Sequence, residues 1–296
     1  MKLATREIKS NLKIRIGGFL VSGLFAASCS QQDVPRSTEV EDLSLRVAHL
    51  EDYAWQDRRQ TGQPVDLKPL IEREALLEEI TENPSELLVL RGLGSQASLL
   101  HLQSSLKDAG AAYPHLMYIP GSSIYQGIGF LSKKMFSDSM ALTDQTYRIK
   151  EQSYQPVAGG VLLSTTQHPR LWIWNSQPPE PSESYERRRN DARILAATLK
   201  SQMQNGDSVL LSMHSREEID SPMFRMIEEI GLKRIIPLDE QGDSWTHRDP
   251  QGILYQQDQW IFVSPEITIP LPKAIVFDTP ALREVGNYRH QGLSLP

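Results

Sequence analysis

The sequence SELLVLRGLGS, residues 85–95, holds a short and almost entirely apolar run between two amphipathic segments. Residues 86–90 predict a buried strand, because an apolar run of this length bounded by turn residues is typical of a strand covered on both faces. Before it, the pattern PLIEREALLEEI at 69–80 predicts a helix that ends at Asn83-Pro84. After it, residues 99–106 predict a second helix, which Gly110 stops.

Similar patterns continue on both sides of this region. The helix from residue 70 is expected to turn Leu70, Leu77 and Ile80 inward and Glu72, Glu74, Glu78 and Glu79 toward solvent. Residues 43–47 alternate apolar and polar side chains, which predicts a strand. Further strands are expected at 115–120, 127–134, 157–167, 170–175, 209–215 and 259–265, and helices at 186–204 and 222–230. Alternating helices and strands exclude a helical bundle, so a mixed α/β domain is predicted.

The first 28 residues have the features of an export signal. Residues 1–15 are rich in lysine and arginine, and Ile16 to Ser28 is apolar but shorter than the roughly 20 residues that span a bilayer. Small residues then precede Cys29, the only cysteine in the chain. This arrangement resembles the lipobox of bacterial lipoproteins, although Ala26 stands where a leucine is usual. The alternatives are an ordinary secretory signal with a coincidental cysteine, or a short anchor that is never cut.

The expected organisation is a lipoprotein signal peptide at 1–28, a lipid-modified Cys29 that begins a polar tether at 29–41, and one domain at 42–296. A lipid on Cys29 would hold the chain on a membrane, because each buried methylene contributes ~0.8 kcal/mol. Ser30 follows the cysteine. A serine there resembles the Gram-negative sorting pattern for the outer membrane, so a lipid-anchored location facing the periplasm is expected.

The composition is that of a globular protein without a general nucleic-acid surface. Hydrophobic residues make up 39% and charged residues 23%, with a formal net charge of -6. A surface for polyanions needs a positive field, which this balance does not supply. The run at 187–189 consists of three arginines that would match phosphate oxygens. Its acidic neighbours Glu183, Glu186 and Asp191 favour a solvated helix start instead.

Seven sequence segments, taken in order, carry a resemblance to a known superfamily. They are LRVAHLEDY at 45–53, SELLVLRGLGS at 85–95, IYQGIGFLSKK at 124–134, RRRNDARILAATL at 187–199, VLLSMHSRE at 209–217, QQDQWIFVSPE at 256–266 and NYRHQGLSL at 287–295. Together they resemble the endonuclease/exonuclease/phosphatase superfamily, the Mg-dependent phosphodiesterases related to pancreatic deoxyribonuclease. The resemblance implies an α/β four-layer sandwich, in which two packed mixed β-sheets are flanked by helices.

The chemistry of that superfamily implies a specific set of site residues. Carboxylates hold a magnesium ion, a His paired with an Asp activates water, and Asn with a second His stabilises the developing charge. The resemblance puts His49 at the Asn of the first strand and Gly92 at the metal-binding Glu. In the segment at 256–266, the resemblance puts Gln259 at the position of a superfamily Asp. These replacements remove the hard oxygen ligands that magnesium needs.

The Asp and Asn of the superfamily's strand-end turn can be placed in two registers. They fall on Met213 and Ser215, or, one residue later, on His214 and Arg216. Neither register supplies a carboxylate.

The last two positions are also altered. An upstream superfamily His falls within residues 175–177, which contain none, and Arg289 replaces the Asp before the final His. Only His290 is retained, and the guanidinium of Arg289 is expected to lower its pKa. Losing one electrostatic donor costs about 10²- to 10³-fold in rate, so several losses predict that the family reaction is absent.

Two functions follow from this reading. The first is a non-catalytic binding or scaffolding module without a required cofactor, whose partner is an unknown envelope protein or a phosphorylated ligand. The second is a divergent metal-dependent phosphodiesterase or phosphatase that uses Mg or another divalent metal with an altered ligand set. A cleft lined by Gly92, Met213 and Gln259 without acids would favour the first.

The second reading has its own candidate residues. His49, His214 and His290 would lie at one mouth of the sandwich, with Asp52 and Asp258 as further ligands. Three imidazoles are a ligand set for zinc or another transition metal. A shift of one residue in strand register would instead point His49 into the core. Clustering of these side chains around a void would favour the enzyme.

Overall fold

The structure is a computed structural model that describes residues 43–53, 70–122, 126–248, 253–269, 274–277 and 289–295. These residues belong to one compact unit, Val40–Pro296. The expected signal peptide, Cys29 and the tether at 29–41 lie outside the described residues, as do the side chains of residues 51 and 52. Among the described helices none is long and apolar enough to cross a membrane.

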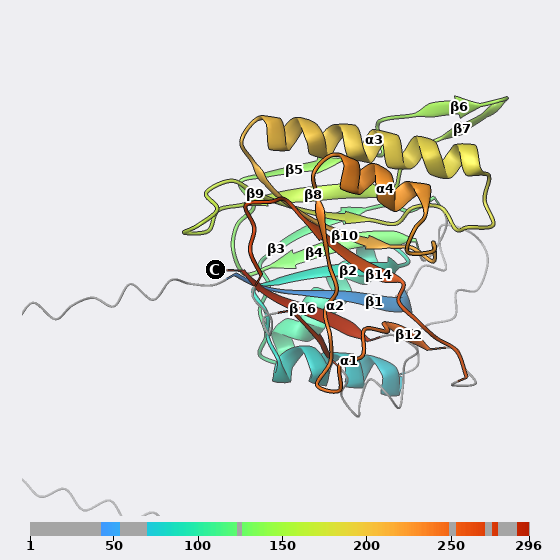
Figure 1. The fold of residues 1–296 in the computed structure, drawn as a ribbon. Helices are drawn as coiled ribbons and strands as arrows, with labels where there is room; N and C mark the ends of the chain where they lie inside the picture. The colour runs from blue at the N-terminus through green and yellow to red at the C-terminus, as the bar shows by residue number, and fades with distance from the viewer. Residues whose placement is uncertain are drawn as a thin grey trace, which may run out of the picture. The chain divides into compact units, whose positions relative to one another are not determined.

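Two six-stranded mixed sheets form the centre of the unit (Figure 1). The first sheet has the order β15 (Ala274–Phe277), β16 (His290–Leu295), β1 (Leu43–Tyr53), β2 (Leu87–Leu93), β4 (Gly127–Ser132), β3 (His115–Ile119). The second has the order β11 (Lys233–Ile235), β14 (Gln259–Val263), β10 (Ser208–His214), β9 (Leu171–Ser176), β8 (Ala158–Leu163), β5 (Asp138–Ala141). Two small hairpins join β6 (Tyr147–Ile149) to β7 (Gln152–Tyr154) and β12 (His247–Arg248) to β13 (Tyr255–Gln256).

Helices cover the outer face of each sheet. Helices α1 (Leu70–Glu82) and α2 (Gln96–Asp108) pack on the first sheet, and α3 (Tyr185–Gln204) and α4 (Pro222–Glu229) on the second (Figure 1). Three apolar cores lie between these layers. One is between the two sheets, and the other two lie between each sheet and its pair of helices. Helix, sheet, sheet and helix make four layers, so the predicted α/β four-layer sandwich is confirmed.

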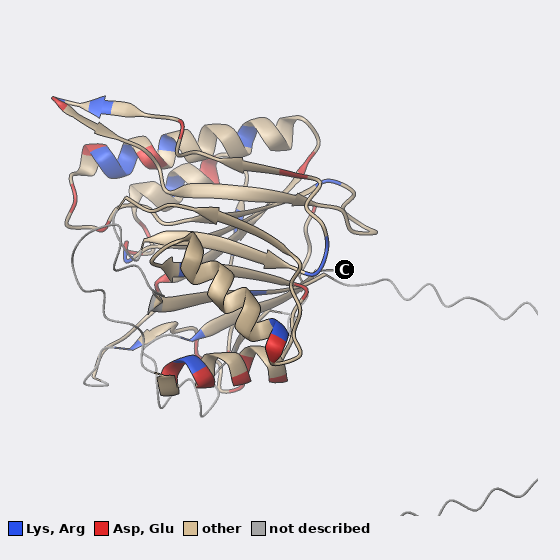
Figure 2. Cartoon of the chain, turned by 180° about the vertical axis from the view of Figure 1, so that it is seen from behind, with Lys and Arg blue, Asp and Glu red and all other residues tan. Residues whose placement is uncertain are grey.

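Strand alternation decides which core each side chain enters, since successive residues point to opposite faces. In β10, Leu210 joins the core between the sheets, whereas Val209, Leu211 and Met213 join the core under α3 and α4. Each fully buried apolar side chain of this kind stabilises the fold by roughly 1.5–3 kcal/mol. Charged residues are concentrated on helices and loops, and the strands carry few (Figure 2).

Capping groups fix the ends of α2 and α4, and the predicted stop of α2 at Gly110 is confirmed, although α2 begins at Gln96 and not at the predicted residue 99. The hydroxyl of Ser95 accepts a hydrogen bond from the backbone N–H of Ser98 at the start of α2, and Gly110 beyond its end has φ +95°. Ser221 caps α4 in the same way, with Pro222 as the first helical residue. Glycine is required at residue 110 because its left-handed backbone is costly for residues with a Cβ.

Two expectations for α1 are wrong. Leu70 is 60% exposed at the first residue of the helix. Glu79, expected in solvent, is 1% exposed and accepts a hydrogen bond of 2.9 Å from Arg46 of β1. Arg46 also donates to the backbone oxygens of Glu79 and Asn83. A buried guanidinium requires such partners, and this requirement overrides the amphipathic pattern of the helix.

Candidate functional site

The parallel strands of the two sheets end in the same region. β1 lies parallel to β2 with His49 opposite Arg91, and β9 lies parallel to β10. The rings of His49 and His214 stack with centroids 4.6 Å apart and an interplanar angle of 28°. This contact joins the carboxyl ends of β1 and β10 across the gap between the sheets. Ligand sites of α/β proteins commonly form at such strand ends. The side chains gathered here, named the mouth cluster, are His49, Arg91, Asn175, Ser212, His214 and Asp258.

Arg91 is the fully buried cation of the mouth cluster. Its Nε donates to Oδ1 of Asn175 at 2.7 Å, and its terminal nitrogen donates to the hydroxyl of Ser212. The Nδ2 of Asn175 donates to the backbone oxygen of Leu90 at 2.9 Å. Burial lowers the pKa of Arg91 to about 9, and the negative charge of Asp258 opposes that change. The guanidinium therefore stays charged at neutral pH.

Asp258 supplies the carboxylate of the mouth cluster, and it is hydrogen-bonded to Thr246. The hydroxyl of Thr246 donates to Oδ1 of Asp258 at 2.8 Å and accepts from the backbone N–H groups of Asp258 and Gln259 at 3.0 and 3.1 Å. Burial raises the pKa of Asp258 to about 6, although the bond from Thr246 and the charges of Arg216 and Arg91 act against the rise. Asp258 is therefore ionised at neutral pH but not strongly acidic.

The geometry of His214 is not that of a His–Asp catalytic pair. Its Nδ1 lies 3.8 Å from Oδ2 of Asp258, which is too long for a hydrogen bond. Burial lowers the pKa of His214 well below 6.5, and the positive charges of His49, Arg91, Arg216 and His247 lower it further. His214 is therefore neutral at pH 7, and it stacks on His49 as an uncharged ring.

The structure distinguishes the two registers of the strand-end turn. Met213 packs in the core beneath α3 and α4, so the alternation of β10 turns Ser212 and His214 toward the first sheet. The register on Met213 and Ser215 therefore points away from the mouth cluster. The register on His214 and Arg216 is the one that reaches it.

His290 lies on a different face from the other two histidines. In β16, Leu293 belongs to the core between the sheets, so Gln291 shares that face and His290 turns to the opposite one. Gln291 donates from Nε2 to the backbone oxygen of Gln259 at 3.2 Å. The structure thus brings His49 and His214 together with Asp258, and leaves His290 outside the stack.

The pKa of His290 has a different cause from the one expected. It lies well below 6.5 because the ring is buried, and the charges of Arg46 and His49 lower it further. Arg289 points elsewhere: its guanidinium pairs with Asp239 and lies 3.9 Å from the ring centroid of Trp245. The expected direction is right, but Arg289 is not among the causes.

The described residues do not fit the magnesium ion that the sequence resemblance implies. Gly92, which the sequence resemblance places at the metal-binding Glu, has φ +75° and no side chain. No group of three His, Cys, Asp or Glu side chains in the described part of the chain could hold a metal ion. Arg91 places a buried positive charge beside Gly92, and Asp258 is bound to Thr246. Magnesium requires several oxygen ligands, which this set does not offer.

Sequence reasoning did not single out Arg91, Ser212 or Thr246. Arg91 had a usable signal, since it is the one charged residue in an otherwise apolar strand and a charge there needs buried partners. Asn175 and Ser212 become its partners only because β9 and β10 pair with these two residues opposite each other. Thr246 lies in a loop without any pattern. The roles of Asp52, His290 and the other candidate residues stay predictions.

Comparisons with known proteins identify the fold. No protein-family model and no curated protein sequence matches the chain. Solved structures do match. An endonuclease/exonuclease/phosphatase from Bacteroides vulgatus has a TM-score of 0.64 at 12% identity, covering 86% of this chain and 98% of that one. The catalytic domain of human Nocturnin has a TM-score of 0.63 at 12% identity, covering 86% and 94%.

A 3′ phosphatase from Neisseria, solved with a product DNA hairpin, has a TM-score of 0.60 at 13% identity and covers 86% of this chain and 99% of that one. The domain therefore has the deoxyribonuclease I-like fold. That fold is the one of the endonuclease/exonuclease/phosphatase superfamily, as the seven sequence segments predicted. At identities this low, the likeness defines the fold and not the reaction.

Proposed function

We propose that this chain is a lipid-anchored binding or scaffolding module, built on the deoxyribonuclease I-like fold without the metal-dependent reaction of that superfamily. A lipid on Cys29 would attach it to the outer membrane, facing the periplasm. Its partner would be another envelope protein or a phosphorylated ligand that reaches the mouth cluster.

The buried guanidinium of Arg91 is the observation that carries the proposal. It is 0% exposed, adjoins Gly92, where the sequence resemblance places a metal ligand, and is bonded to the second sheet through Asn175 and Ser212. A divalent cation nearby would be repelled by it. Two like unit charges 4 Å apart repel each other by roughly 4 kcal/mol at an effective dielectric constant of 20, and a divalent cation carries two such charges. Arg91 thus supplies a fixed positive charge and disfavours a metal.

One observation favours the altered-site enzyme instead. His49, His214 and Asp258 lie together, and imidazole with carboxylate is a common acid–base combination. Against it, His214 is 4% exposed, and its nearest approach to Asp258 exceeds hydrogen-bonding distance. The binding module is therefore the better supported function.

Calorimetric titration of the purified full-length chain with MgCl₂, MnCl₂ and ZnCl₂ tests this proposal. No saturable heat is expected with magnesium or manganese, since the described carboxylates are too few. Stoichiometric magnesium or manganese binding that is lost in Asp258→Asn would overturn the proposal and favour the divergent enzyme.

A further inference from the structure

The strand β3 forms an edge of the first sheet and carries no charged residue. Its sequence is HLMYI, and β4 is its one hydrogen-bonded neighbour among the described strands. The first four residues of β3 are half-buried, whereas every residue of β4 is buried. An uncharged edge strand is unusual, because proteins commonly protect their sheet edges with charged side chains or with a covering segment.

The other edge strands of the two sheets are protected in these ways. β5 carries Asp138, and β11 carries Lys233 and Arg234. The outer edge of β15 is covered by Leu238, which forms a parallel bridge with Ile275. Of the edge strands that the structure describes, β3 alone has neither kind of protection.

Prolines set the length of this edge. Pro114 directly precedes β3, and Pro120 directly follows it. Proline has no backbone N–H and cannot donate to a neighbouring strand. Pairing along β3 is therefore confined to the five residues between the two prolines.

The second sheet extends beyond β3 and leaves a step. Ile119 of β3 lies against Gly159 of β8, where an added Cβ would collide with the isoleucine side chain. β5 is the next strand after β8. Ser139 of β5 lies opposite Val161, which belongs to the core between the sheets, so Ser139 faces the same way. Ser139 is nevertheless exposed, which shows that the position facing β5 in the first sheet is open.

Three half-buried apolar side chains border this open position. Met117 of β3, Phe136 before β5 and Ala141 of β5 all pack against the core between the sheets. The ring of Phe136 also contacts His115 of β3 edge-on, with centroids 6.3 Å apart. The core is therefore incompletely covered on this side. Met117, Phe136, Ser139 and Ala141 are together named the edge seat.

We propose that an extended peptide segment of a partner protein binds here as a seventh strand of the first sheet, paired with β3 and lying over β5. Backbone hydrogen bonds to β3 would supply affinity, and an apolar side chain at an alternate position would contact the edge seat. The edge seat carries no charge, so charge complementarity favours an uncharged segment. A charged side chain buried there would lack a partner.

A second copy of this domain fits less well. If its β3 paired with β3 here, its own β5 would extend beyond that strand in the same way, and the two β5 strands would collide. A single extended segment avoids this collision. The mouth cluster contains no residue of β3 or β5, so this proposal does not rest on the proposed function.

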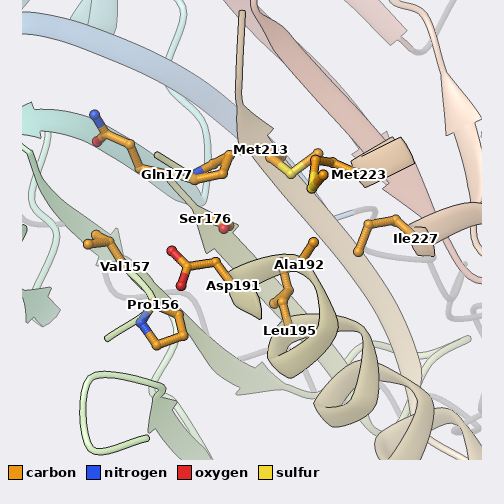
Figure 3. Close-up of a pocket in the computed structure, with 11 residues that line it drawn as sticks. Pro156, Val157, Ser176, Gln177, Asp191, Ala192, Leu195, Met213, Met223 and Ile227 are labelled. Carbon is orange, nitrogen blue, oxygen red and sulfur yellow. The ribbon is translucent and has the colours of Figure 1, made fainter. Parts of the chain in front are cut away.

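Methyl NMR of the full-length chain labelled with ¹³C-methyl methionine tests the proposal, with the capped peptide acetyl-STVTVTS-amide as the probe. The Met117 methyl resonance should shift saturably as the peptide is added. Met213 and Met223 lie on the opposite face of the second sheet, beneath α3 and α4 (Figure 3), and should not respond. A Met117 resonance that shows no saturable shift would overturn the proposal.

A second peptide tests the strand pairing itself. In acetyl-STVPVTS-amide the central threonine is replaced by proline, so the central N–H is absent. This peptide should bind about tenfold more weakly. Equal affinity of the two peptides would show that strand pairing does not contribute, which contradicts the proposal. Both measurements use the wild-type chain and do not depend on the folding of a variant.

Variants of the protein test the edge seat. Phe136→Ala should weaken binding of acetyl-STVTVTS-amide about fivefold, because the apolar contact is lost. Met140→Ala is the matched control and should leave binding unchanged, since Met140 lies opposite Gly160, which faces Trp174 on the other side of the sheet. Sedimentation of the wild type examines the remaining occupant. A concentration-dependent dimer that the peptide dissociates would assign the edge to a second copy and overturn the proposal.

Discussion

Arg91 of β2 donates from Nε to Oδ1 of Asn175 on β9 at 2.7 Å, which joins the two sheets through buried polar side chains. Asn175 returns a hydrogen bond to the backbone oxygen of Leu90, next to Arg91. The same guanidinium also donates to Ser212 of β10. The Arg91 side chain therefore connects β2 of the first sheet to β9 and β10 of the second sheet through hydrogen bonds.

Arg91→Leu should lower the free energy of unfolding by about 2–4 kcal/mol, because Asn175 and Ser212 lose their donor while staying buried. Urea denaturation of the full-length chain measures the change. Arg189→Leu, on the exposed side of α3, is the matched control and should stay within about 0.5 kcal/mol of the wild type. An Arg91→Leu protein as stable as the wild type would show that the network adds no net stability.

Glu79→Ala should destabilise the fold by about 3–5 kcal/mol, because it leaves the buried guanidinium of Arg46 without its carboxylate. The neighbouring Glu78→Ala removes the same chemical group from an exposed position of the same helix and should change stability little. Thermal and urea unfolding of both variants give the comparison. Equal effects of the two substitutions would contradict the buried ion pair.

The long elements of the fold were predictable, whereas the short edge strands were not. Helix α2 has a serine cap and a terminal glycine, and β2 begins with the apolar run LLVL at 87–90, so both can be recognised locally. Strands β5, β11 and β15 have only three or four residues each and show no alternation. They form because a neighbouring strand offers unpaired backbone groups, which is a tertiary effect.

The site was harder to predict for two physical reasons. A slip of one residue reverses the face of every strand side chain, so sequence alone could not choose between Met213 and His214. Buried charges are satisfied by distant partners: Glu79 is 33 positions from Arg46, and Asn175 is 84 positions from Arg91. The same alternation turns His290 to the opposite face of the first sheet from His49, although the sequence resemblance puts both at one mouth.

Asp258→Asn should change the pH dependence of stability. The folded pKa of Asp258 is about 6 against an ordinary 3.8, so the folded state binds this proton more tightly than the unfolded state. The stability that the raised pKa contributes is fully present below pH 3.8 and is lost as the pH rises through 6. A rise of about 2 in the pKa corresponds to about 3 kcal/mol.

The wild type should therefore gain up to about 3 kcal/mol relative to Asp258→Asn between pH 7 and pH 4, measured by urea denaturation across that range. The depressed pKa of His214 acts in the opposite direction, but His214 is present in both proteins and cancels in the difference. Asp144→Asn should show no such dependence. A difference between wild type and Asp258→Asn that is the same at both pH values would contradict the raised pKa.

Cys29→Ser should move the protein from the membrane to the soluble fraction, because a lipid on Cys29 is the proposed anchor. Fractionation of cells that express each form from the same promoter gives the measurement, with Ser30→Ala as a control that retains the cysteine. Membrane association that is unchanged in Cys29→Ser would remove the lipid anchor from the account.

The central proposal is that this deoxyribonuclease I-like domain does not carry out the metal-dependent reaction that the sequence resemblance implies. The most direct measurement is hydrolysis of bis-p-nitrophenyl phosphate by the purified full-length chain with Mg²⁺, Mn²⁺ or Zn²⁺, compared with the same protein in EDTA. We expect the rates to be equal within error, and unchanged in His214→Gln and His290→Ala. Metal-stimulated turnover by the wild type that disappears in either variant would contradict the claim and identify the chain as a divergent phosphodiesterase.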